Sequence, residues 1–227
     1  MVTAIYFLLF ILLSSSCEAS KILVVFGMPS RSHANLGEGV VRNLLKGGHE
    51  VTYIRVFEYK NPPPNLRQID VSSNIDFLPA DAINIKKIME KNGTMNDHSI
   101  VRTMMVQLAA KTVEHQNVKK LLEDPRENFD VVIVEWMFSD VTAGLATVFG
   151  CPLIWLSPVE VNSLVISLID EAPNPAHSSD ALSPNMPPFT FLQRLEELWT
   201  RIKLQYYGLS KFDRMESDAY ERLIVPY

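Results

Sequence analysis

The stretch KILVVFG, residues Lys21–Gly27, is the segment from which the fold can be predicted. It is short and almost wholly apolar, which is typical of a strand buried on both faces of a parallel sheet. Apolar residues at helical spacing follow over 36–45, and Gly47-Gly48 ends that helix, since glycine adopts the left-handed cap conformation without steric strain. Glu50–Phe57 is rich in β-branched and aromatic residues and predicts the next strand. Strand, helix and strand in this order predict a right-handed βαβ unit.

The same alternation returns along the chain. Ile75–Leu78 is a weak strand candidate, and a long helical pattern runs from Ile100 to Leu122. Phe129–Val134 is a second fully apolar strand, and Pro152–Leu156 is a further buried one after a short helix. Alternating strands and helices predict an α/β fold with a doubly wound, mostly parallel sheet.

The last third of the chain is less regular. Pro173–Pro188 is a long proline-rich connection, and a loop of that length in a compact domain is either functional or mobile. Apolar residues at helical spacing follow from Leu192 to Tyr206. The chain then runs to Ile224–Tyr227 without an obvious final element.

The N-terminus has the pattern of a cleaved signal peptide, which we expect to cover residues 1–19 and to leave a domain over 20–227. Tyr6–Leu13 is a short apolar run followed by small residues before the expected cleavage point. The run is too short to span a bilayer comfortably. It is preceded by no Lys or Arg, and a retained anchor is the alternative. Entry into the secretory pathway makes Asn92, in the sequon Asn92-Gly93-Thr94, the expected glycosylation site. Removal of the signal leaves Cys151 without a cysteine partner, so we expect no internal disulfide and a buried, structural thiol.

Composition and missing motifs exclude several functions. A net charge of -5 over 227 residues argues against a nucleic-acid partner. The histidines lack metal-ligand spacing, so no metal is expected. The chain has no dinucleotide-binding G-x-G-x-x-G after the first strand, no phosphate-binding loop and no G-x-S-x-G nucleophile motif, which argues against a hydrolase.

His33 and Glu135 are the candidate catalytic residues. In open α/β sheets, ligands bind beyond the carboxyl ends of the strands, and His33 follows the first strand there at the start of a helix. Glu135 follows the second apolar strand, so parallel strands bring both residues to one edge, where the carboxylate can orient the imidazole. Asp140 is a competitor for that role. A helix cap or surface histidine, and a solvent-facing or helix-capping carboxylate, are the simpler interpretations.

Several segments together resemble the N-terminal domain of insect UDP-glycosyltransferases. They are Ser30–His33, Leu36–Gly39, Gly48–Thr52, Phe129–Trp136 and Phe149–Ile154, and the resemblance covers essentially the whole chain. It implies the Rossmann-like acceptor-binding domain of a two-domain GT-B enzyme in the lumen of the endoplasmic reticulum. It also implies a UDP-sugar co-substrate, with UDP-glucose expected, a small lipophilic acceptor bearing a hydroxyl, and no other cofactor.

The resemblance also implies residue roles. The histidine matching His33 takes the acceptor proton, and transfer inverts the anomeric centre. Many relatives have an aspartate at the position of Glu135, so this chain has a longer carboxylate there. Ser30, Arg31, Ser32 and Asp140 are expected to contribute to substrate binding. The loops 61–66 and 81–97 are expected to shape the acceptor pocket.

The chain lacks segments resembling the family's donor-binding domain and C-terminal membrane anchor. We therefore expect no transferase activity from it alone, and membrane contact only through the missing anchor. The alternative is a lumenal module that binds lipophilic ligands without catalysis, or that regulates or assembles with full-length relatives.

Overall fold

The computed structural model describes residues 19–78, 98–159, 161–169, 171, 174–180, 183–203 and 209–227. Within them, a five-stranded sheet has the order β3-β2-β1-β4-β5, and every neighbouring pair is parallel. The strands are β1 (Lys21–Phe26), β2 (Glu50–Arg55), β3 (Leu66–Asp70), β4 (Val131–Glu135) and β5 (Leu153–Leu156). The predicted α/β fold with a parallel sheet is confirmed.

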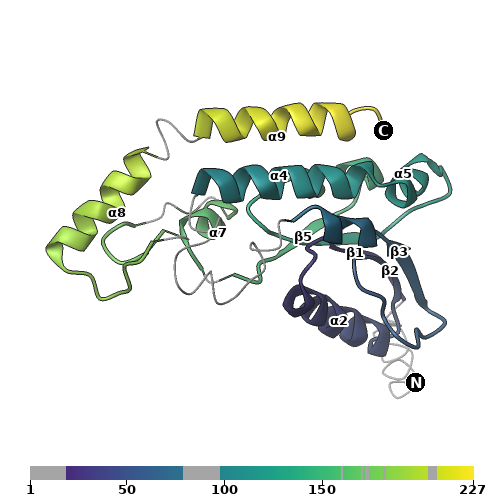
Figure 1. Ribbon diagram of the computed structural model, residues 1–227. Coiled ribbons are helices and arrows are strands. Elements are labelled where there is room, and N and C mark those ends of the chain that lie inside the picture. The colour runs from purple at the N-terminus through teal and green to yellow at the C-terminus, as the bar shows by residue number, and fades with distance from the viewer. Residues whose placement is uncertain are drawn as a thin grey trace, which may run out of the picture.

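Helices cover both faces of this sheet (Figure 1). The α-helices are α2 (Arg31–Lys46), α4 (His98–Glu114), α5 (Gln116–Glu123), α6 (Gly144–Phe149), α7 (Ser163–Ser167), α8 (Phe191–Lys203) and α9 (Leu209–Leu223). The short 3₁₀ helices are η1 (Ser72–Asp76) and η3 (Val141–Ala143). In Figure 1, α2 lies on one side of the sheet, α4, α5 and α9 lie on the other, and α8 stands away from both layers. Among the described residues, no helix is sufficiently long and apolar for a membrane span.

The two layers follow from alternation along the buried strands. Ile22, Val24 and Phe26 of β1 pack in a cluster with Val41 of α2. Leu23, in contrast, belongs to the opposite cluster, which includes residues of α4, α5, α6 and α9. Successive side chains of a strand point to opposite faces, so a wholly apolar strand requires cover on both sides. The central strands were therefore predictable, and the doubly wound arrangement with them.

The third strand differs from the prediction. Ile75–Leu78 was expected as a weak strand, but 72–76 form η1, and the strand is Leu66–Asp70. This strand lies at the edge of the sheet beside β2 and alternates less clearly because several of its side chains are polar and half-buried. A polar strand lacks the continuous apolar run by which β1 and β4 were identified. The other edge strand, β5, has such a run and was expected to be buried, but its residues are half-buried or exposed, Ile154 by 50%.

The helical pattern over 100–122 is two helices. α4 ends at Glu114, and α5 begins at Gln116 after His115, whose Nδ1 accepts a hydrogen bond from the Asn117 backbone N–H. His115 therefore caps a new helix instead of continuing the first.

The C-terminal helix α9 was not predicted. It packs along α4, and within the described part of this segment Ala219, Leu223 and Ile224 are buried. Met215 and Tyr220 are partly buried against the same cluster, so apolar residues do recur at helical spacing here, and the pattern was not recognised in the sequence. The signal-peptide interpretation and Asn92 lie outside the described residues. Cys151 is a free thiol and is half-buried, not fully buried as expected.

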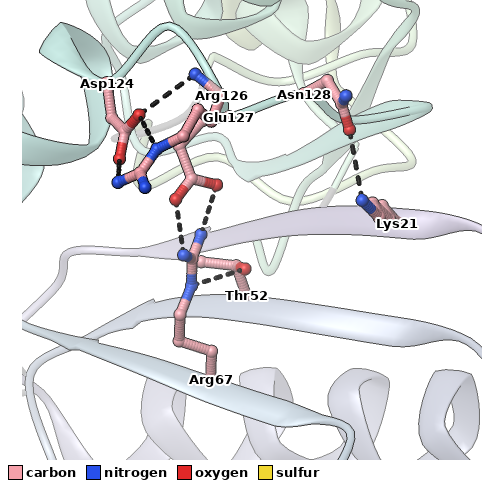
Figure 2. Close-up of polar contacts among 7 residues, drawn as sticks. All are labelled: Lys21, Thr52, Arg67, Asp124, Arg126, Glu127 and Asn128. Carbon is pink, nitrogen blue, oxygen red and sulfur yellow. Dashed lines mark hydrogen bonds and ion pairs between the residues drawn. The ribbon is translucent and has the colours of Figure 1, made fainter.

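Two arginine–carboxylate pairs lie at the amino-terminal edge of the sheet (Figure 2). Arg67 of β3 donates to both carboxylate oxygens of Glu127, over 2.6 and 2.7 Å, and its Nε donates to Thr52 of β2. Arg126 makes a similar pair with Asp124, but only within its own loop and with its side chain 88% exposed. The first pair joins the edge strand to the loop before β4, whereas the second joins neighbours in sequence.

We expect Glu127→Gln to lower the free energy of unfolding by up to about 1 kcal/mol at low salt, and by less at high salt, because the pair is partly exposed and screened. Arg126→Gln is the matched control and should leave stability unchanged. Chemical denaturation at two ionic strengths measures both variants. Equal effects of the two substitutions would contradict the proposed difference between the pairs.

Candidate active site

His33 and Glu135 meet at the carboxyl edge of the sheet. His33 is the third residue of α2, and Glu135 is the last residue of β4, which lies beside β1. Nδ1 of His33 lies 2.5 Å from Oε1 of Glu135, although 102 positions separate the two residues in sequence. The side chains are 16% and 2% exposed. The contact is therefore shielded from water on the carboxylate side and open on the imidazole side.

The environment of Glu135 is apolar. Burial raises the pKa of its carboxyl above the usual range, and the hydrogen bonds to His33 and to the Met28 backbone act in the opposite direction. A neutral imidazole that donates from Nδ1 to this carboxylate has an unprotonated Nε2. Such a ring can accept a proton at Nε2, and the carboxylate then stabilises the resulting cation.

The residues before His33 form the start of α2. Ser30 is the N-cap, in extended conformation, and its hydroxyl lies 2.9 Å from that of Ser32. The Arg31 guanidinium stacks 4.0 Å from the centre of the Phe57 ring. The positive end of the α2 dipole lies here. These three residues thus adjoin His33, and their part in substrate binding remains a prediction.

A small cavity of about 40 Å³ is lined in part by Glu135. Three methionines, Met28, Met105 and Met137, contribute to its wall, together with Ser139 and other residues. Methionine side chains adapt to ligands of varied shape.

Loop 61–66 does not reach this edge. It precedes β3 and therefore lies at the amino-terminal end of the sheet, where Pro64, Asn65 and Leu66 line a separate cavity of about 510 Å³. The expectation that it shapes a pocket beside His33 is wrong, because a loop entering a parallel strand lies opposite the carboxyl edge. Loop 81–97 lies outside the described residues.

Asp140 is engaged elsewhere. Its Oδ1 accepts a hydrogen bond of 2.9 Å from Nε1 of Trp136, and its backbone N–H donates to Glu216 of α9. The structure thus brings Glu135, and not Asp140, to His33. No three metal-ligating side chains gather within the described part of the chain.

Glu216 of α9 is a largely buried carboxyl that accepts a hydrogen bond from the Asp140 backbone N–H. Burial, and then the charge of Asp140, raise its carboxyl pKa. The folded protein therefore holds the proton more tightly than the unfolded chain, so this contribution to stability is present below the ordinary glutamate pKa and is lost as the pH rises through the raised one.

We expect Glu216→Gln to be more stable than the wild type at about pH 8. The stability of the variant should also change less between about pH 5 and pH 8 than that of the wild type. The glutamine keeps an oxygen for the Asp140 N–H but carries no charge. Thermal unfolding at the two pH values measures this. A variant that loses stability at the higher pH would show that the hydrogen bond outweighs the charge.

Asn74 supports the loop that leads to His33. It is fully buried, and its Nδ2 donates to the Gly27 carbonyl over 3.0 Å and to the Thr112 hydroxyl over 2.8 Å. Thr112 in turn donates to the Leu108 carbonyl. This chain of bonds ties the end of β1 to α4. These bonds were not predicted, because Ile75–Leu78, next to Asn74, was expected to form a strand.

Three curated proteins that are similar to this chain are UDP-glycosyltransferases, the family that the sequence resembles. No family model matches the chain. It is 29% identical over 175 residues to UDP-glucosyltransferase 2 of Dactylopius coccus, covering 74% of this chain and 32% of that protein. It is 28% identical over 128 residues to an ecdysteroid UDP-glucosyltransferase of Spodoptera littoralis nuclear polyhedrosis virus, covering 52% of this chain and 25% of that protein.

A third relative and a solved structure are also similar to this chain. A UDP-glycosyltransferase of Dactylopius coccus is 26% identical over 60% of this chain and 26% of its own length. The crystal structure of the glycotransferase of kitacinnamycin aligns with a TM-score of 0.43 and 20% identity, over 67% of this chain and 34% of that chain. The alignments span a quarter to a third of the curated relatives.

Proposed function

We propose that this chain, whose curated homologues are UDP-glycosyltransferases, is the acceptor-binding half of an inverting enzyme of GT-B architecture. It would act in the secretory pathway, with a UDP-sugar as co-substrate, UDP-glucose by preference, and a small lipophilic molecule bearing a hydroxyl as acceptor. The contact between His33 and Glu135 is the observation that carries this proposal.

The proposed reaction uses the outer nitrogen of His33. Nε2 accepts the proton of the acceptor hydroxyl while its oxygen attacks the anomeric carbon of the sugar. The bond from that carbon to the UDP oxygen breaks with inversion, and UDP leaves with the bonding electrons. Glu135 holds the ring by Nδ1 and stabilises the imidazolium until the proton is released. A buried carboxylate suits this role, because few water molecules compete for its oxygen.

In the proposed reaction, a donor-binding domain must hold the UDP-sugar against the acceptor. No segment of the 227 residues resembles that domain of the family. We therefore propose that this chain alone binds an acceptor without transferring sugar, since transfer requires both reactants in one geometry. The test is an assay with UDP-glucose and a phenolic acceptor. It compares the chain by itself with the chain joined to the C-terminal region of UDP-glucosyltransferase 2 of Dactylopius coccus. Product is expected only from the joined protein.

Two results would contradict the proposal in different ways. Turnover by the chain alone would show that it positions the donor itself. A joined protein that folds and binds both ligands but forms no product would instead favour the alternative, a binding module without catalysis.

A further inference from the structure

The helix α8 presents its apolar face to solvent. Phe191, Leu195, Leu198, Trp199 and Ile202 recur at helical spacing and lie on one side, and each is exposed, Phe191 by 72% and Trp199 by 60%. An amphipathic surface helix normally turns this face toward the core. Figure 1 shows α8 projecting from the two layers that enclose the sheet.

The opposite face of α8 is fixed by a buried carboxylate. Glu197 is 1% exposed and accepts hydrogen bonds from the Asp180 backbone N–H over 2.9 Å, from Asn185 Nδ2 over 3.0 Å and from the Ser183 hydroxyl. Turning the apolar face inward would break all three bonds and expose the groups they satisfy. The outward orientation is therefore built into the helix.

The chemistry of this face fits a lipid surface. Trp199 and Phe191 are residue types that anchor helices at membrane interfaces, and Arg194 and Lys203 are exposed at the two margins of the stripe. The Glu196 carboxylate is drawn toward the loop side, where Asn185 Nδ2 donates to it. The margins thus offer cations to anionic headgroups on both sides of an apolar centre.

A second copy of the chain fits less well. A helix of 13 residues is about 20 Å long and about 10 Å wide, so one face offers about 200 Å². A stable protein interface buries about 800 Å² on each partner. A membrane surface has no such requirement, because one amphipathic helix can insert its apolar side between headgroups.

We propose that α8 binds the surface of a membrane containing anionic phospholipids, with its axis in the plane of the interface and the Trp199 side inserted. This contact does not depend on catalysis and places no helix across the bilayer. It departs from the sequence-based expectation that the membrane is contacted only through a C-terminal anchor. If the proposed function is right, it would hold the acceptor-binding domain against the membrane in which lipophilic acceptors are concentrated.

The test uses the full chain with vesicles of phosphatidylcholine and phosphatidylserine, prepared with and without brominated acyl chains. Bromine quenches only nearby indoles, so the quenching lost in Trp199→Phe reports the insertion of α8. We expect quenching in the wild type and little in this variant. We also expect Leu195→Gln/Trp199→Gln to lower the partition coefficient at least about tenfold.

The matched control is Ile75→Gln/Val225→Gln, which removes two exposed apolar side chains outside α8 and should bind as the wild type does. The apolar run Tyr6–Leu13 is present in every variant, so differences between them report α8. Circular dichroism verifies that each variant is folded. A charge-reversal variant, Arg194→Glu/Lys203→Glu, leaves the apolar face intact and should weaken binding to anionic vesicles.

Three outcomes would overturn the proposal. One is an unquenched Trp199 on vesicles, and another is equal partition of the wild type and the α8 double variant. The third is self-association of the wild type without any quenching by lipid. If Leu195→Gln/Trp199→Gln abolished that association, the apolar face of α8 would bind a second copy of the chain.

Discussion

His33→Ala is expected to lower the transfer rate of the joined protein by at least about 100-fold, the usual range for loss of a general base being about 10² to 10⁴. The methyl group can accept no proton, so the acceptor must attack as a neutral hydroxyl. The affinity for UDP-glucose should be unchanged, because His33 contacts the acceptor and not the nucleotide in this mechanism. Steady-state kinetics with varied donor and acceptor measure both effects.

Two controls make this result specific. His177→Ala replaces an exposed histidine of the connection before α8 and should leave the rate unchanged. Asp140→Asn alters a carboxylate that binds Trp136 and not His33, so it should have a smaller effect than Glu135→Gln. Undiminished turnover in His33→Ala would remove the proposed mechanism, whatever the other variants do.

Gly37→Ala is expected to destabilise the fold by about 1–3 kcal/mol, the range for overpacking a filled core. Gly37 lies on the face of α2 that contacts the sheet, and a Cβ there would meet the Tyr53 hydroxyl and lie 2.8 Å from Cγ of Phe26. Both rings are buried and pack edge to face, so neither can move away freely. The helix must shift instead, and it carries His33.

Gly39→Ala provides the matched control within the same helix. A Cβ at this position meets nothing within 4 Å, and alanine is the better helix former by about 1 kcal/mol. Chemical denaturation should therefore show opposite signs for the two substitutions. A stabilising Gly37→Ala would mean that α2 does not pack as closely on β1 and β2 as described.

The central part of the fold was predictable because burial leaves a strong mark on the sequence. β1 and β4 are apolar at nearly every position, since helices cover both of their faces. β3 was missed for the converse reason, because it is a polar edge strand. The helix α9 carries apolar residues at helical spacing, among them Met215, Ala219 and Leu223, but this pattern was not recognised in the sequence.

The site was predictable in part. The position of His33 beyond β1 follows from the general location of ligands in open α/β sheets. Its pairing with Glu135 depends on β1 and β4 being neighbours, which the order of strands along the chain does not reveal. Glu216 gave no sequence signal either, because its contact with the Asp140 backbone depends on the unpredicted helix α9.

The protonation state of the His33 ring tests the central claim most directly. Long-range ¹H–¹⁵N spectra of the neutral imidazole distinguish a proton on Nδ1 from one on Nε2. We expect the proton on Nδ1, held by Glu135, with Nε2 bare, and a loss of this preference in Glu135→Gln. A proton found on Nε2 in the wild type would contradict the account, because that nitrogen could then accept nothing from an acceptor hydroxyl.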